Sequence, residues 1–268
     1  MRWMKGKTAY LNPGLTVMIC WSCLCGLWME AGAQGWPPQW EVLGRRVSVQ
    51  QSRSASYRDH CVYQQKITLT RIETEKGNWQ EKSTIIQRFT AETGPNVKGE
   101  VIMRVVSATD GGGKPMANGE KELGLLIRAA FWEELFYPFF PEKMKRLEIL
   151  EIQETEENGS SMLNVHFATK ENLKEAPSLE GQAHISPSSG ELLRLELMNV
   201  QGFESMDKQA TGFIISRLDV DYSSPEPGIR LPFMATLEGL SKSKPFKGSF
   251  RIRYQESAHT LIQDQPKN

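Results

Sequence analysis

Alternation of apolar and polar side chains, with a period of two residues, dominates the chain after residue 60. In 61–69 the odd positions are largely apolar and the even positions largely polar, and the same alternation returns in 191–198 and 247–256. This period is typical of strands that bury one face and expose the other. Short turns such as Asn158-Gly159 join neighbouring runs, which favours antiparallel hairpins. The pattern predicts about nine strands in one mainly antiparallel sheet.

One segment interrupts the strands with a different pattern. Residues 122–137 read ELGLLIRAAFWEELFY, and Pro138 follows them. On a helix this segment is apolar on most sides, so it must be almost surrounded by protein. Its charges at Arg128, Glu133 and Glu134 argue against a membrane span. Together with the strands, it predicts an α+β fold whose antiparallel sheet packs on a buried apolar helix over about 120–137.

The first 33 residues have the order of a secretory signal peptide. A basic start that includes Arg2 precedes an apolar run over 15–29, and the small residues Ala31-Gly32-Ala33 follow. We expect cleavage after Ala33 and a periplasmic or secreted protein without a stable membrane span. A retained anchor is the alternative, but the apolar run has only about 15 residues, and a spanning helix needs about 20.

These patterns predict the domain organisation. After the signal peptide over 1–33 we expect an N-terminal lead-in over 34–59, in which 52–59 fits either a short helix or a loop. A single antiparallel-sheet domain over 60–256 contains the helix at about 120–137, and a polar tail covers 257–268. Trp36 and Trp40 of the lead-in can dock on the body of the protein or on a partner.

Charge and cysteine content exclude several classes of protein. The chain has 32 basic and 32 acidic residues, so no long-range field attracts phosphates, and we expect no nucleic-acid partner. Three of the four cysteines lie in the leader, which leaves Cys61. A secreted chain with one cysteine has no internal disulfide, so it must be held together by core packing, with Cys61 as a small buried side chain.

No arrangement of side chains in the sequence indicates catalysis or a metal site. The Gly-rich stretch 109–119 lacks the order of a P-loop, because Pro115 follows Lys114. Asp219 and Asp221 share one strand face about 6.5 Å apart, but no third ligand follows at a suitable spacing. The four histidines are scattered without metal-ligand spacing. We expect no enzyme, no cofactor and no metal, with a hydrolase of unrecognised site as an alternative.

A hairpin in the second half of the chain resembles that of a known family. Residues 181–195 read GQAHISPSSGELLRL, which is similar to a recurring hairpin of the periplasmic lipoprotein-carrier and outer-membrane lipoprotein-sorting class: strand, Asp-Pro-x-Thr-Gly, strand. Ser186 stands where that class has Asp and Ser189 where it has Thr, while Pro187 and Gly190 keep the bend. The resemblance implies a highly curved, half-barrel-like sheet around the helix and a place in the bacterial envelope.

Three functions follow as hypotheses. The first is a non-enzymatic exported protein that binds an apolar ligand or a lipidated partner, and the second is a structural or protein-interaction component of the envelope that docks a partner through an edge strand or the lead-in. The third is the hydrolase of unrecognised site. For the first, we expect a pocket beside the helix where part of the concave face stays open; the alternative is that the aromatic side chains of this segment fill the core. The predicted lining residues are Phe131, Trp132, Phe136, Phe139 and Phe140.

Overall fold

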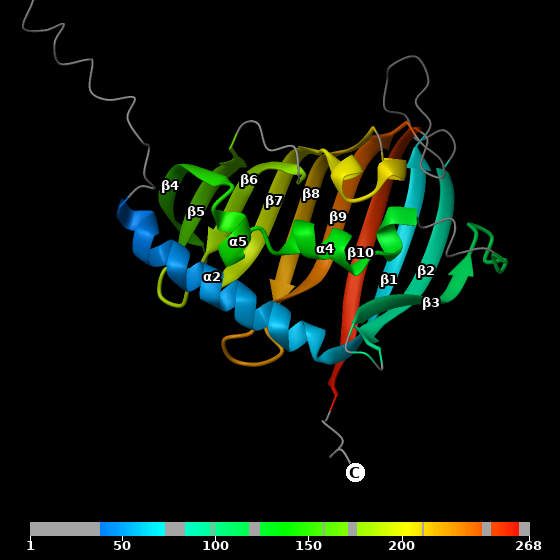
Figure 1. The fold of residues 1–268 in the computed structure, drawn as a ribbon, viewed down its shortest axis with the longest axis horizontal. Coiled ribbons are helices and arrows are strands. Elements are labelled where there is room, and N and C mark those ends of the chain that lie inside the picture. The colour runs from blue at the N-terminus through cyan, green and yellow to red at the C-terminus, as the bar shows by residue number, and fades with distance from the viewer. Residues whose placement is uncertain are drawn as a thin grey trace, which may run out of the picture. The chain divides into compact units, whose positions relative to one another are not determined.

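One sheet of ten strands forms the frame of the structure, and every strand is antiparallel to its neighbours. The predicted antiparallel sheet is confirmed, with ten strands rather than about nine. Their order across the sheet is β3-β2-β1-β10-β9-β8-β7-β6-β5-β4 (Figure 1). The strands are β1 Cys61–Ile72, β2 Thr84–Pro95, β3 Val101–Thr109, β4 Leu147–Glu157, β5 Ser160–Thr169, β6 Ser178–Ile185, β7 Leu192–Gln201, β8 Phe213–Ser223, β9 Leu231–Ser241 and β10 Gly248–Leu261.

The protein is represented by a computed structural model that describes residues 38–72, 84–96, 98, 100–117, 124–157, 159–170, 176–210, 212–242 and 248–262. Contacts group the chain into two units, Met1–Trp36 and Pro37–Asn268. The predicted signal peptide over 1–33 lies outside the described residues, as do Trp36 and the last six positions of the predicted polar tail. Everything that follows concerns the second unit.

Within the sheet, β1 and β10, the first and last strands in the sequence, pair with each other and form a seam. Three strands, β1 to β3, form one meander and β4 to β10 form another, and pairing of β1 with β10 joins them. The pairing runs from Ile72↔Ser249 to Cys61↔Leu261, with a register shift between Val62 and Gln64. β10 therefore continues to Leu261, beyond the predicted end of the sheet at residue 256, because β1 supplies a partner for its last residues.

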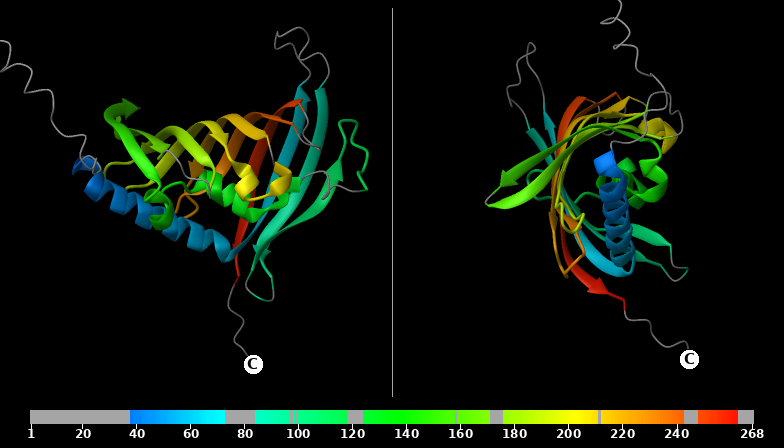
Figure 2. Two further views of the ribbon diagram at one scale, coloured as in Figure 1. Left: turned by 45° about the horizontal axis from the view of Figure 1, so that its top comes forward. Right: turned by 90° about the vertical axis from the view of Figure 1, so that its left-hand side faces the viewer.

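The sheet is strongly curved and wraps around helical segments that lie on its concave side (Figure 2). We call this side the inner face and the opposite side the outer face. The helices are α2 Pro38–Asp59, α4 Ala129–Phe136 and α5 Pro141–Met144, and the short 3-10 helices are η1 Gly124–Ile127, η2 Phe203–Ser205 and η3 Lys208–Ala210. Among the described residues, none of these helices combines the length and the apolar character of a membrane span.

The helix α2 is longer than the short helix or loop expected within 52–59. Its 22 residues cross the inner face diagonally (Figure 1). The stripe that faces the sheet begins with apolar side chains and continues with polar ones, so a search for apolar helical periodicity misses its second half. The residues of this stripe are Trp40, Leu43, Val47, Ser48, Gln51, Ser54, Ala55 and Arg58.

The apolar segment predicted as one helix over about 120–137 contains a break. The 3-10 turn η1 ends at Ile127, Arg128 is extended (φ −94°, ψ 118°), and α4 starts at Ala129. The break directs the Arg128 guanidinium towards Asp207, whose carboxylate is 2.9 Å away. The indole nitrogen of Trp132 donates a hydrogen bond to the Leu126 carbonyl at 2.9 Å, which holds the two pieces together.

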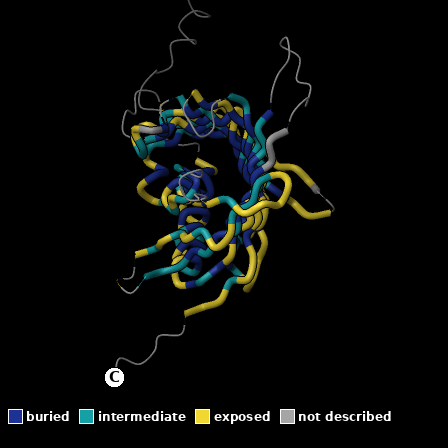
Figure 3. Tube along the Cα trace, turned by 90° about the vertical axis from the view of Figure 1, so that its right-hand side faces the viewer, coloured by how far each residue is buried: buried dark blue, intermediate teal, exposed yellow. Residues whose placement is uncertain are grey.

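Burial follows the alternation along the strands. Buried positions gather where the sheet and the helices face each other, and hairpin ends are exposed (Figure 3). In β1 the side chains of Cys61, Ile67 and Leu69 are fully buried, as the period of two predicts. The predicted hairpin joins β6 to β7: the Gly190 amide donates to the Ser186 carbonyl at 2.9 Å, and Gly190 has a φ of 73°, a value that glycine adopts without strain.

Close approach of β6 to β7 depends on Gly181. A Cβ atom at this position would lie 2.0 Å from the Glu196 carbonyl oxygen and 2.9 Å from Cδ2 of Leu197. We expect Gly181→Ala to lower the free energy of unfolding by about 1–3 kcal/mol, because the strands must move apart. The measurement is the urea midpoint. The control Gly112→Ala, whose new atom would lie no closer than 3.4 Å to a neighbour, should unfold like the wild type; equal midpoints for both variants would contradict the packing argument.

Candidate functional site

The aromatic side chains predicted to line a pocket pack on one another and on the inner face. Phe131, Trp132, Phe136 and Phe139 are fully buried. Ring centroids of Trp132 and Phe136 lie 4.5 and 5.2 Å from that of Tyr254 on β10. Each buried ring contributes on the order of 1.5–3 kcal/mol to folding. In the present conformation these four rings form core, and their role as ligand-lining residues stays a prediction.

Phe140 differs from the other four aromatic residues, because it is only partly buried. It stacks on Tyr137 with a centroid distance of 5.6 Å, and the Lys143 ammonium lies 5.3 Å from its ring. Lys143 also pairs with Glu134 at 3.0 Å. These contacts attach the start of α5 to the end of α4.

An open groove lies on the inner face at the β4–β5 end of the sheet, between these strands and the first half of α2. Its volume is about 430 Å³, within the range of small-molecule sites. We call it the α2 groove. It is lined by Gln39, Val42, Leu43, Arg46, Ile152, Glu154, Leu163 and Pro187.

The α2 groove combines apolar walls with two opposite charges. Val42 is 62% exposed, although its neighbours Trp40, Leu43 and Val47 on α2 are buried; Val49, which lies outside the groove, is also exposed, at 65%. Ile152 and Leu163 are partly buried on the facing strands. The Arg46 guanidinium approaches only the Pro187 carbonyl, at 3.5 Å, among the hydrogen bonds of the described residues. The groove therefore offers uncovered apolar surface with a cation beside it.

A charged cluster is buried beneath the C-terminal end of α2. Arg58 donates from Nε and Nη2 to the two carboxylate oxygens of Glu256, at 2.9 and 2.6 Å. Its guanidinium also lies 4.6 Å from the centre of the Tyr63 ring. The Tyr254 hydroxyl donates to Glu256, and the His259 imidazole lies 2.7 Å from the same carboxylate. The partners come from α2, β1 and β10, so the cluster joins the helix to the seam.

Burial and charge act in opposite directions on the acid of this cluster. Burial alone raises the pKa of Glu256, but the Arg58 guanidinium and hydrogen bonds from His259, Arg58 and Tyr254 outweigh it, and the pKa lies below its usual value. Burial and the Glu256 charge raise the pKa of Tyr254 well above the ordinary value. Because every charged group has a partner inside the protein, this cluster is suited to holding α2 in place.

Of the residues singled out in the sequence, His259 belongs to this cluster, and most of the others lie outside it. Cys61 is a buried free thiol, as expected. His166 and His184 sit on the outer face of β5 and β6, close to Glu180 and Glu196 respectively. Among the described residues, no group of three potential ligands could hold a metal ion. Asp219 pairs with Arg217 at 2.8 Å.

Sequence reasoning missed the α2 groove and the buried cluster for the same reason. Both depend on α2, whose inward stripe is partly polar. The spacing of Trp40, Leu43 and Val47 is the one signal that could have located the helix, because it continues at helical intervals through Gln51 and Arg58. Trp40 itself is fully buried and lies 5.5 Å from the Phe139 ring. It therefore docks on the body, as one of the two expected outcomes.

Comparisons with known proteins concern the fold. No family model matches this sequence, and no curated protein matches it significantly. Solved structures that match include a LolA superfamily protein from Nitrosomonas europaea, with 9% identity, coverage of 81% of this chain and 96% of that chain, and a TM-score of 0.32. MucB in complex with MucA(peri) is 10% identical, with coverage of 79% of this chain and 94% of that chain and a TM-score of 0.22. The complex of MucA and MucB from Pseudomonas aeruginosa is 11% identical, with coverage of 78% of this chain and 93% of that chain and a TM-score of 0.22. Superpositions this loose carry no argument about function, which rests on the geometry of the chain itself.

Removal of the buried carboxylate tests the role of the cluster. We expect Glu256→Gln to lower the free energy of unfolding by about 3–5 kcal/mol, because Arg58 would remain buried without its counter-charge. The matched control is Glu238→Gln, which breaks the partly exposed pair with Arg251 and should cost at most about 1 kcal/mol. Urea unfolding at neutral pH measures both. A smaller loss for the buried position than for the exposed one would contradict the assignment.

The same pair predicts a dependence of stability on acid. The pKa of Glu256 is lower in the folded state than in the unfolded state. The carboxylate therefore makes its full contribution to the free energy of unfolding when the pH is above the unfolded-state pKa. This contribution is lost as the pH falls through the lowered folded-state pKa. The wild type should therefore lose more stability than Glu256→Gln on acidification over this window. Parallel curves for the two proteins would exclude the linkage.

Proposed function

We propose that this protein is an exported, non-enzymatic binding protein whose α2 groove takes up an apolar chain carried by a lipid or a lipidated partner. The observation that carries the proposal is the opening of about 430 Å³ beside α2 on an inner face whose neighbouring part is filled by aromatic rings. Export is supported by the order of charged, apolar and small residues in 1–33.

Apolar side chains at the groove favour a chain-like ligand. The apolar side chain of Val42 is exposed to water in this structure. A hydrocarbon chain bound between Val42 and the side chains of Ile152 and Leu163 would remove all three from water. Such burial contributes about 25 cal/mol for each Å² of apolar surface covered. The mixed apolar lining therefore supports a ligand with several methylene groups rather than a polar metabolite.

The charge beside the groove favours an acidic head on that chain. Arg46 is exposed and lies on the same groove as Glu154. A carboxylate or phosphate at the end of the chain would pair with Arg46 and stay away from Glu154. An anionic amphiphile thus meets both the apolar walls and the cation.

The aromatic residues would support the site from behind. Trp40 precedes the lining residues Val42 and Leu43 on α2, and it packs on Phe139, which lies 4.9 Å from the Phe167 ring on β5. This row of rings sets the distance between α2 and the sheet next to the groove. A ligand that also touches Phe139 or Phe140 would require these rings to move, which keeps the predicted lining set open to test.

A fluorescent amphiphile tests the proposal directly. We expect 11-(dansylamino)undecanoic acid to bind the wild type saturably with increased emission. Ile152→Glu should weaken this binding at least about tenfold, because a carboxylate would occupy an apolar wall beside Glu154. The control Leu150→Glu changes an exposed residue of the same strand outside the lining set and should bind like the wild type. Equal binding by both variants, or no saturable binding by the wild type, would overturn the proposal.

A protein-interaction role has one observation in its favour. β3 forms one edge of the sheet, and its side chains Ile102 and Val106 are 47% and 60% exposed. Edge strands with exposed apolar side chains can pair with a strand of another protein. Photo-crosslinking groups placed at Val106 and at Val42 in intact cells separate the two roles. A protein adduct at Val106 alone supports the interaction role, and a lipid adduct at Val42 supports uptake of an apolar chain.

A further inference from the structure

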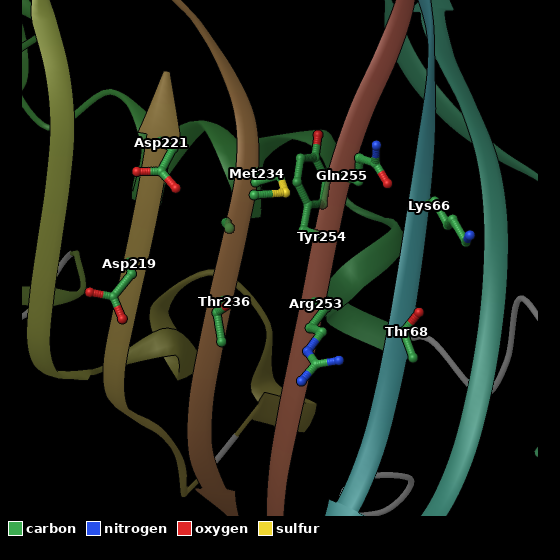
Figure 4. A pocket seen from close by; sticks show the side chains of 10 residues that line it. Lys66, Thr68, Asp219, Asp221, Met234, Thr236, Arg253, Tyr254 and Gln255 are labelled. Atoms are coloured by element: carbon green, nitrogen blue, oxygen red, sulfur yellow. The ribbon is translucent and has the colours of Figure 1, made fainter. Parts of the chain in front are cut away.

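The outer face of the sheet contains a second hollow, on the side opposite the α2 groove. Its volume is about 390 Å³, and its floor is formed by the strands at Ala235 and Tyr254, whose side chains are buried on the inner face. Figure 4 shows the side chains that surround it, which come from four adjacent strands. The remaining lining residues are Lys66, Thr68, Asp219, Asp221, Met234, Thr236, Arg253 and Gln255.

Strand register arranges these side chains in two rows. One row reads Lys66–Gln255–Met234–Asp221, and the other reads Thr68–Arg253–Thr236–Asp219. Both cations lie on β1 and β10, both carboxylates lie on β8, and the uncharged residues of β9 separate them (Figure 4). The hollow therefore has a positive end, an uncharged middle and a negative end.

Charges in this hollow are less completely paired than those around it. Elsewhere on the outer face Arg194 pairs with Glu196 at 3.1 Å, and Arg251 pairs with Glu238 at 2.8 Å. Of the four charged lining residues, Asp219 pairs with Arg217 at 2.8 Å and lies 3.7 Å from Arg194. The other three, Lys66, Arg253 and Asp221, have no ion-pair partner within the described part of the chain. An unpaired cation and an unpaired carboxylate at opposite ends of one depression offer two separate contacts for a ligand.

We propose that this hollow binds a short zwitterionic peptide, with its carboxylate at Arg253 and Lys66 and its ammonium group at Asp221. The separation of the charges sets the length. β10 and β8 are two strand spacings apart, or about 10 Å, and three extended residues span about the same distance. Met234 and Thr236 lie beneath the middle of such a ligand, where small apolar side chains fit.

The probe for this site is trialanine, with N-acetyl-trialanine and trialanine amide as ligands that each lack one terminal charge. We expect saturable binding of trialanine by isothermal titration calorimetry, and about tenfold weaker binding of each capped form, because each loses one charge-assisted contact. The affinity should fall as salt is added. An absence of saturable binding, or equal affinity for all three peptides, would overturn the proposal.

Two variants assign the ends of the ligand. Asp221→Asn should weaken trialanine binding about tenfold and leave the already weak N-acetyl form unchanged. Arg253→Gln should weaken trialanine and leave the amide form unchanged. Both residues are exposed, so the variants should fold normally. The matched control Glu180→Gln, on the outer face of β6 and outside the hollow, should bind like the wild type. Equal losses for capped and uncapped peptides would show that the orientation is wrong.

Discussion

The ion pair between Arg58 and Glu256 holds together the parts of this fold that are most distant in sequence. It is fully buried, bidentate and surrounded by aromatic rings and hydrogen-bonding side chains. Burial of such a pair gives little net stability, but it is specific, because each charge tolerates no other position. It places the C-terminal end of α2 over the β1–β10 seam, and the direction of the helix from this point leaves the α2 groove open at its other end.

Two further hydrogen bonds along α2 fix its position on the sheet. Gln51 accepts a hydrogen bond from the Phe139 amide at 2.8 Å, and Ser54 accepts one from the Arg230 amide at 2.9 Å. The helix is therefore attached to the α4–α5 connection in its middle and to the β8–β9 loop region near its end. Polar attachment needs matched partners at fixed distances, so it sets the orientation of α2 more narrowly than an apolar stripe would.

The strands could be predicted from the sequence because their signal is local. Alternation in 61–69 or in 191–198 needs no knowledge of what packs on the buried face, and the turn residues of the 186–190 hairpin act on their own backbone. α2 could not be predicted in this way, because Gln51, Ser54 and Arg58 look like surface residues until their partners are known. The partner of Arg58 lies 198 positions later in the chain, and nothing local in the sequence connects the two.

The two candidate sites likewise depend on residues that are distant in sequence, so they could not be predicted from local patterns. The hollow of the outer face depends on strand register, which places Asp221 beside Met234 and Gln255 beside Lys66, and a slip of one residue would turn these side chains to the inner face. The sequence predicted that Asp219 and Asp221 share one face of a strand, but it did not predict the cations on the neighbouring strands. The apolar segment with Phe131, Trp132 and Phe136 is buried, as its composition predicts, whereas the open space lies beside a helix that could not be recognised from the sequence.

The seam between the first and last strands also determines the order in which the fold can be completed. During synthesis α2 and β1 emerge early, but the strand that β1 needs on its second side, and the carboxylate that Arg58 needs, belong to the last element of the chain. Contacts between such distant segments form late and slow the folding of a domain. A chain of this kind stays incomplete until its C-terminal strand is available, so removal of β10 would leave both β1 and Arg58 without their partners.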